Sequence, residues 1–165
     1  MLPGQTLQSM SAKPFHIYDD EFYDVIGDNP SLTVIATSAV DPIFHEAVTW
    51  YPPTDEVFFV QNAGPPAAGT GLNKSSIIQK ISLADAEKVR RGTLKAAPVT
   101  VVNNTGTKII NPNGGTNWKG KIIFAGEGQG DRVPSALYVM DPTPPYNAYS
   151  KSIPNQKSTT GDDQY

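Results

Sequence analysis

The residue of this sequence best suited to chemistry is Glu46, a carboxylate in the otherwise apolar stretch IFHEAVTWYPPTDEVFFVQN, residues 43–62. Burying a carboxylate without a partner is costly, so Glu46 either binds a metal or lies solvated at the end of a strand. Hard cations such as Ca²⁺ prefer oxygen ligands. A cation held next to a substrate polarises a carbonyl group and lowers the pKa of a bound water. Glu46 is therefore the candidate metal ligand, whereas the sequence identifies no catalytic base.

His45 is the immediate neighbour of Glu46. Adjacent residues of a regular strand point to opposite faces, so the two side chains are not expected to line the same channel equally. A packed or hydrogen-bonded role for His45 is favoured over a catalytic one. The sequence contains 2 histidines in total, which excludes a metal site built from several histidines.

Three further polar residues are candidates for lining a channel or contacting a substrate: Asn62, Asn113 and Glu127. Asn113 lies in the segment NPNGG, where asparagine also commonly forms turns, and both roles remain open. Glu127 lies in GEGQG, where it contacts a substrate or solvates a loop. That loop lacks the Gly-Lys-Ser/Thr ending of a phosphate-binding loop. The chain also contains no Gly-x-Ser-x-Gly elbow, which argues against a serine hydrolase.

The elements that would position these residues are short and mostly extended. Residues 43–62 predict a β-hairpin with a turn at Pro52-Pro53-Thr54-Asp55, because prolines and an acidic residue separate two apolar runs. A short helix or turn is expected at residues 21–26, ending at Gly27, and another in the segment ADAEKVRRG. Further strands are predicted at residues 31–38, 77–83, 98–102, 121–125 and 135–140.

The order strand, tight turn, strand, polar loop, strand occurs twice. In this comparison Phe58 corresponds to Ile122, Ile77 corresponds to Leu137, and a tryptophan precedes the turn in each unit. A repeat of about four strands is typical of a β-propeller blade. A β-sandwich also fits many short strands but does not explain the repeat. A propeller closes with about 4–8 blades, and this sequence holds two units.

The predicted fold class is therefore all-β: a partial, truncated propeller of about two blades within residues 15–146. A disordered lead-in is expected at residues 1–14 and a disordered polar tail at residues 147–165. The stretch AGPPAAGTGLNKSS, residues 63–76, is expected to be a surface connector or a binding loop.

Composition narrows the function. The formal net charge of −3 is too small to favour nucleic acid or an anionic membrane as a partner. No apolar run approaches the roughly 20 residues needed to span a bilayer, and no secretory signal is visible. With 0 cysteines, disulfides, cysteine-based zinc sites and a thiol nucleophile are excluded.

Five segments together resemble the N-terminal part of fungal lactonohydrolases, in the superfamily of gluconolactonase, senescence-marker protein and luciferin-regenerating enzyme. They are KPFHIYDDEFYDVIG, DPIFHEAVTWYPPTDEVFFVQNAG, GTGLNKSSIIQKISL, INPNGGTNWKGKIIFAGEGQG and PSALYVMDPTPPYN. The resemblance covers about residues 13–147. It implies a six-bladed propeller that hydrolyses aldonolactone- or pantolactone-type substrates with a divalent cation, usually calcium, in its central channel.

By this resemblance Glu46 is the metal carboxylate of the first blade, in a motif similar to E-[GA]-[PV]-x-W. The family's other metal ligands, two asparagines and an aspartate, lie in later blades and are not found in this sequence. We therefore expect weak calcium binding and no activity from this chain alone. The alternative is a non-catalytic fragment that associates through exposed blade edges. Family membership also suggests a secretory route, although no signal is visible.

Overall fold

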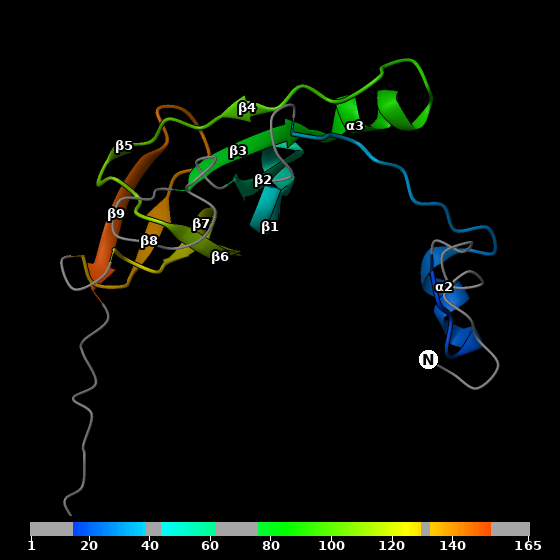
Figure 1. Cartoon of the computed structure of the whole chain (residues 1–165), viewed down its shortest axis with the longest axis horizontal. Coiled ribbons are helices and arrows are strands. Elements are labelled where there is room, and N and C mark those ends of the chain that lie inside the picture. Colours follow the sequence, from blue (N-terminus) through cyan, green and yellow to red (C-terminus); the bar gives the residue numbers. More distant parts are fainter. Residues whose placement is uncertain (1–14, 39–43, 62–75, 130–132, 153–165) are drawn as a thin grey trace, which may run out of the picture. The chain divides into compact units, whose positions relative to one another are not determined.

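The computed structural model describes residues 15–38, 44–61, 76–129 and 133–152. The chain divides into two compact units, residues 1–34 and 35–165, and each is described by itself (Figure 1). The predicted disorder at residues 1–14, the candidate residue Asn62 and most of the loop 63–76 lie outside the described residues.

Among its described residues, 15–34, the first unit contains one short helical segment. A 3-10 turn, η1 (Asp20–Phe22), leads directly into α2 (Tyr23–Ile26). The Asp19 side chain caps the start by accepting a hydrogen bond from the Glu21 amide at 3.0 Å. Gly27, at a φ of 77°, ends the helix and donates its amide hydrogen to the carbonyl of Tyr23. The helix predicted at residues 21–26, with its end at Gly27, is confirmed.

The second unit contains a four-stranded sheet followed by a five-stranded sheet, and neither closes into a barrel. The first sheet is an antiparallel meander in chain order, interrupted by η2 (Pro52–Thr54) and α3 (Leu83–Arg90). Its strands are β1 (Phe44–Tyr51), β2 (Glu56–Gln61), β3 (Ile77–Ser82) and β4 (Thr100–Val101). The hairpin predicted for residues 43–62 and the strand predicted for 77–83 are confirmed, whereas the strand predicted for 98–102 is shorter than expected.

The second sheet repeats this plan. Four antiparallel strands follow chain order, and β5 adds to the far edge by pairing in parallel with β9. The strands are β5 (Thr105–Gly106), β6 (Pro112–Trp118), β7 (Lys121–Gly126), β8 (Ala136–Met140) and β9 (Asn147–Ser152). A mostly β fold with a repeated strand order is therefore confirmed.

The two sheets share one hydrophobic core. Phe58 and Val60 of β2 pack in the same cluster as Phe124 of β7 and Met140 of β8, and each is at most 1% exposed. Ile78 of β3 joins the same cluster. Alternate residues of a strand share a face, which is why every second residue of β2 reaches this core. The sheets therefore form one packed body rather than two separate domains.

Two predictions were wrong. Residues 31–38 form no strand, although the run SLTVIATS contains β-branched residues. In this stretch the carbonyl of Ile35 accepts a hydrogen bond from the backbone amide of Ala97 at 2.8 Å. A residue can favour extended backbone without finding a neighbouring strand to pair with.

The prediction of a disordered polar tail from residue 147 onward was also wrong for the first six residues, which form β9. Five residues of β9 pair with β8, and Ala148 turns a buried side chain to the core, at 3% exposure. β9 lies between β8 and the two-residue β5, so backbone hydrogen bonds to both neighbours hold a strand with few apolar side chains. Residues 153–165 lie outside the described residues.

Candidate functional site

The candidate site lies where the first strands of the two sheets run side by side. A Cβ on Gly115 of β6 would lie 3.0 Å from the Cβ of Ala47 on β1. Further along, the side-chain amide of Asn117 donates a hydrogen bond to the backbone carbonyl of Trp50 at 2.5 Å. Gly115 therefore lies next to Ala47, and Asn117, later in β6, lies next to Trp50, later in β1. The two strands run in the same direction, so their N-terminal ends lie next to each other.

Glu46 lies at the N-terminal end of β1 and is half-buried. The strand is irregular on both sides of it, since the pairing with β2 shifts between Phe44 and Glu46 and again between Glu46 and Thr49. Ala47, next in the chain, has a positive φ of 57°. Such bulges re-aim side chains near functional sites. The alternation rule that separates His45 from Glu46 therefore does not apply directly here, and the His45 side chain is outside the described part of the structure.

Asn113 and Glu127 are brought together at the N-terminal end of β6. The Asn113 side-chain amide donates a short hydrogen bond to the Glu127 carboxylate. The contact arises because β6 and β7 are antiparallel: Pro112 pairs with Gly126, so the start of one strand meets the end of the other. Two residues that the sequence placed 14 apart therefore act as one polar pair.

The position of Glu127 is fixed by its backbone as well. Its amide donates to the Asn111 carbonyl at 3.1 Å, and its own carbonyl accepts from the Ser135 hydroxyl at 3.0 Å. The Glu127 side chain is exposed, whereas Asn113 is half-buried. Glu127 can thus present its second carboxylate oxygen to a solute while the first accepts from Asn113.

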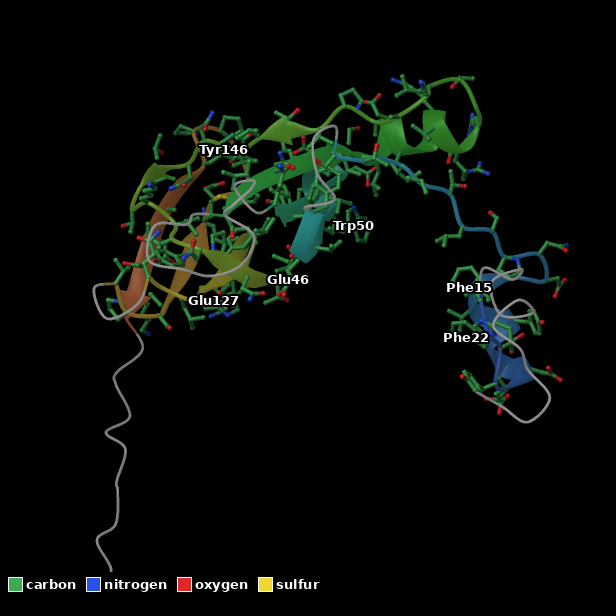
Figure 2. The ribbon with its side chains drawn as sticks, viewed as in Figure 1. Phe15, Phe22, Glu46, Trp50, Glu127 and Tyr146 are labelled. Carbon is green, nitrogen blue, oxygen red and sulfur yellow. The ribbon has the colours of Figure 1, made fainter. Side chains whose placement is uncertain are left out.

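Glu46 shares this end of the molecule with the pair. It precedes the Ala47–Gly115 contact on β1, just as Asn113 precedes it on β6. In Figure 2 Glu46 and Glu127 lie on the same side of the two sheets. The structure thus gathers three of the sequence-predicted site residues at one end of two neighbouring strands.

Asn111 is a residue that sequence reasoning missed. It is 3% exposed and has a φ of 43°. Its side-chain amide donates to the Gly128 carbonyl at 2.6 Å, and its side-chain oxygen accepts from the Ser76 amide at 3.3 Å. Asn111 therefore ties the start of β3 in the first sheet to the loop after β7 in the second. The available signal was an asparagine before a proline, since asparagine tolerates left-handed backbone.

The described residues do not by themselves form a calcium centre. Calcium takes about 6–8 oxygen ligands. In the ranges that the structure describes, no three side chains of histidine, cysteine, aspartate or glutamate gather closely enough to hold a metal. Glu46 fits the role of one carboxylate ligand, but these residues do not form the complete site by themselves.

Away from this end, a half-buried ion pair lies between the sheets. Lys80 of β3 contacts Glu56 of β2 at 2.6 Å, and its ammonium lies 5.3 Å from the ring centroid of Tyr146. Burial lowers the pKa of Lys80, but the interactions with Glu56 and Tyr146 outweigh it, and the pKa is raised above its usual value. This group stays charged near neutral pH and is structural.

A second ion pair lies at the start of β7. Lys121 donates a short hydrogen bond to Asp141, which also accepts from the Thr143 hydroxyl at 2.7 Å. These hydrogen bonds lower the pKa of Asp141 to about 2. Both side chains are about one-third exposed, so the pair is well screened by solvent.

Comparisons with models of protein families, with curated proteins and with solved structures found no match to this chain. In the described part of the structure, no helix is both long and apolar enough to cross a membrane.

Proposed function

We propose that this chain is part of a calcium-dependent lactonohydrolase of the β-propeller type, in which Glu46 is one metal carboxylate. The observation that carries the proposal is that Glu46 and the Asn113–Glu127 pair lie at the same ends of the neighbouring strands β1 and β6. Oxygen-bearing side chains that converge at the ends of neighbouring strands suit both cation and sugar-lactone chemistry.

The arrangement of the sheets supports the propeller part of the proposal. Each sheet contains an antiparallel meander in chain order, as a blade does. The first strands of the two meanders lie side by side and parallel, and both meanders contribute to one core. Stacked blades with parallel innermost strands have this relation.

In this proposal Asn113 and Glu127 contact the hydroxyl groups of an aldonolactone or pantolactone. The Glu127 carboxylate accepts hydrogen bonds from substrate hydroxyls, and Asn113 holds that carboxylate in place. A bound divalent cation would supply carbonyl polarisation. Its remaining ligands would come from outside this chain, because the two asparagines and the aspartate that the resemblance implies are not found in this sequence.

The test is a calcium titration of the full chain, followed by NMR of backbone amides. We expect weak binding, roughly in the millimolar range for a site with few carboxylates, with shifts centred on Ala47 and Val48. Glu46→Gln should abolish these shifts. Glu87→Gln, which changes an exposed carboxylate on α3, should leave them unchanged. Calcium shifts that persist in Glu46→Gln would contradict the assignment of Glu46.

A second candidate function is non-catalytic association through uncovered sheet surface. Three large apolar or aromatic side chains of the second sheet are exposed by 37–51%: Trp118, Leu137 and Tyr149. Exposed strand edges and apolar faces favour self-association.

A pH-stat assay with gluconolactone and added calcium separates the two candidates. Proton release above the spontaneous rate, lost in Glu46→Gln, supports hydrolysis by this chain. Release at the spontaneous rate at every calcium level, together with a sedimentation coefficient that rises with protein concentration, supports the association module.

A further inference from the structure

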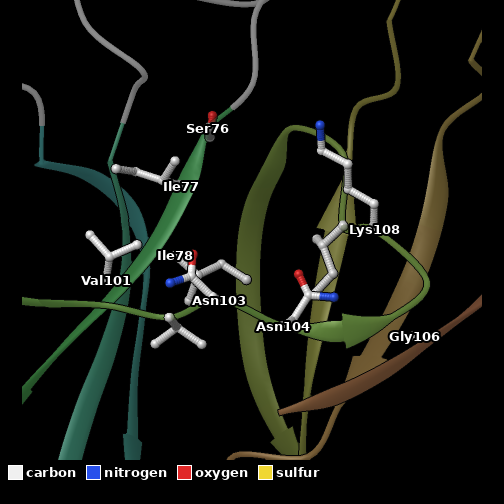
Figure 3. Close-up of a pocket in the computed structure, with 10 residues that line it drawn as sticks. Ser76, Ile77, Ile78, Val101, Asn103, Asn104, Gly106 and Lys108 are labelled. Atoms are coloured by element: carbon white, nitrogen blue, oxygen red, sulfur yellow. The ribbon is translucent and has the colours of Figure 1, made fainter. Parts of the chain in front are cut away.

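A pocket of about 400 Å³ lies between the first sheet and the segment that crosses to the second sheet (Figure 3). One wall comes from β3 and β4, and the other comes from residues 103–109. It is two strands removed from β1, since β2 lies between β1 and β3. Adjacent strands are about 4.8 Å apart, so this pocket is separate from the Glu46 position.

The crossing segment is held at both ends, so the pocket is formed before any ligand binds. At one end the Val102 amide donates to the Ile78 carbonyl at 2.8 Å. At the other end Gly106 of β5 pairs with Ala148 of β9. Only glycine fits there, because a Cβ on Gly106 would lie 2.4 Å from the Ala148 carbonyl oxygen.

The wall between these anchors is stiffened locally. The Asn104 side-chain amide donates to the carbonyl of Thr105 at 3.2 Å and to that of Thr107 at 2.8 Å. The Thr105 hydroxyl donates to the Pro145 carbonyl at 3.0 Å. A preformed wall reduces the ordering cost that a ligand must overcome.

The lining has one sign of charge. Lys108 is the single charged residue among those that line the pocket, and no carboxylate accompanies it. Lys108 is exposed, and no ion pair or hydrogen bond of its ammonium is formed within the described residues. In Figure 3 the Lys108 ammonium lies toward the end of the pocket occupied by Ser76, and Asn103 and Asn104 lie toward the other end.

Besides Lys108, the lining combines the polar residues Ser76, Asn103 and Asn104 with an aliphatic surface. Ile77, Val101, Val102 and Ile109 contribute aliphatic surface, and Val101 is 45% exposed. A volume of about 400 Å³ is at the small end of the range for ligand pockets, roughly 300–1,000 Å³. An aliphatic surface next to one cation favours a small anion with a hydrocarbon body.

We propose that this pocket binds a small aliphatic carboxylate, with its carboxylate on Lys108 and its chain on the valines and isoleucines. The proposal is independent of calcium binding at Glu46. A carboxylate accepts charge-assisted hydrogen bonds from an ammonium, and these are stronger than neutral ones. An alcohol of the same length lacks this interaction.

The experiment compares hexanoate with hexan-1-ol by titration of the full chain at neutral pH, followed by amide NMR. We expect saturable shifts at Gly106 and Lys108 with hexanoate, and binding of hexanol that is about tenfold weaker. Lys108→Met should weaken hexanoate about tenfold and leave hexanol unchanged, whereas Lys108→Arg should retain hexanoate. Lys95→Met, which removes an exposed lysine outside the pocket, should change neither.

Three outcomes would overturn the proposal: no saturable shift with hexanoate at tens of millimolar, equal affinity for hexanol, or unchanged hexanoate affinity in Lys108→Met. Thermal unfolding of each variant, followed by circular dichroism, verifies that the fold is retained. Because Lys108 is exposed and unpaired within the described residues, its replacement is not expected to unfold the chain.

Discussion

The two sheets of the second unit share the same antiparallel meander. They differ in the turn of the first hairpin and in the fourth strand. The first hairpin turns through η2 and Asp55, which has a left-handed φ of 52° and accepts a hydrogen bond from the Trp50 indole at 3.1 Å. The second turns through Lys119 and Gly120 alone, both with positive φ. That is the two-residue turn whose twist suits a hairpin.

The fourth strands differ more. In the first sheet β4 is two residues long, whereas in the second β9 is six residues long and carries β5 on its outer edge. The shared core draws on β1, β2 and β3 of the first sheet and mainly on β7 and β8 of the second, to which β9 adds Ala148. The fourth strand differs between the two sheets. The comparison shows that the repeat lies in the inner hairpins. The outer strands differ in length and in their neighbours.

The largest expected effect comes from breaking the shared core from either side. Phe58→Ala in the first sheet and Phe124→Ala in the second each remove a fully buried ring. Each should lower the free energy of unfolding by about 3–5 kcal/mol. Urea unfolding of single-tryptophan variants, retaining Trp50 or Trp118, reports on the two sheets separately. Coincident transitions are expected, and two separated transitions would show that the sheets unfold independently.

The close approach of β1 and β6 is tested by a pair of adjacent glycines. Gly115→Ala would place a Cβ 3.0 Å from Ala47 and 3.1 Å from the Thr49 hydroxyl. We expect a loss of about 1–3 kcal/mol in unfolding free energy. Gly114→Ala is the matched control, because a Cβ there meets nothing within 4 Å. Equal losses for the two variants would contradict the tight contact between the strands.

A smaller effect concerns pH. The folded pKa of Asp141 is about 2, below its ordinary 3.8, so its stabilisation is present above the ordinary value and is lost as the pH falls toward 2. Asp141→Asn should be less stable than the original chain at pH 6, and the difference should shrink between about pH 4 and pH 2. Thermal unfolding across this range measures it. A difference that is constant with pH would exclude a charge-dependent role.

The smallest expected effect is in the second turn. Lys119→Asn should stabilise the hairpin by a few tenths of a kcal/mol, because asparagine adopts left-handed backbone more readily. The gain is reduced by loss of the Lys119 ammonium, which lies 5.0 Å from the centroid of the Trp118 ring. Lys119→Met, which loses the charge without the conformational gain, should be slightly destabilised. Unfolding in urea distinguishes the two variants, and destabilisation by Lys119→Asn would contradict the turn argument.

Apolar runs and turn residues were sufficient to predict the inner hairpins, since β2 and β7 are continuous apolar strands next to recognisable turns. The predicted correspondence of Phe58 with Ile122 is confirmed, because both side chains are 0% exposed and belong to the shared core. Val60 and Phe124, two residues further along the two strands, also belong to it. Alternate residues of a strand share a face, so the apolar pattern of each strand was sufficient to predict this correspondence.

At the candidate site, sequence could nominate Glu46, Asn113 and Glu127 but could not pair the last two. Their contact depends on the antiparallel register of β6 with β7, which places residues far apart in the chain opposite one another. Asn111 was missed because its role depends on the Ser76 amide, 35 residues away in the chain. The strand β9 was missed because its side chains are polar and its stabilisation comes mainly from backbone pairing.

The parallel pairing of β5 with β9 has a consequence for the order in which the protein folds during synthesis. Thr105 of β5 can pair with Asn147 of β9 only after the ribosome has added Asn147 to the chain. At about 5–20 residues per second, the ribosome needs several seconds to add the intervening residues. During that interval all four strands of the first sheet can pair with one another, whereas the backbone groups of β5 that bond to β9 have no partner strand. A nascent chain stalled before Asn147 should therefore be the species most in need of a chaperone.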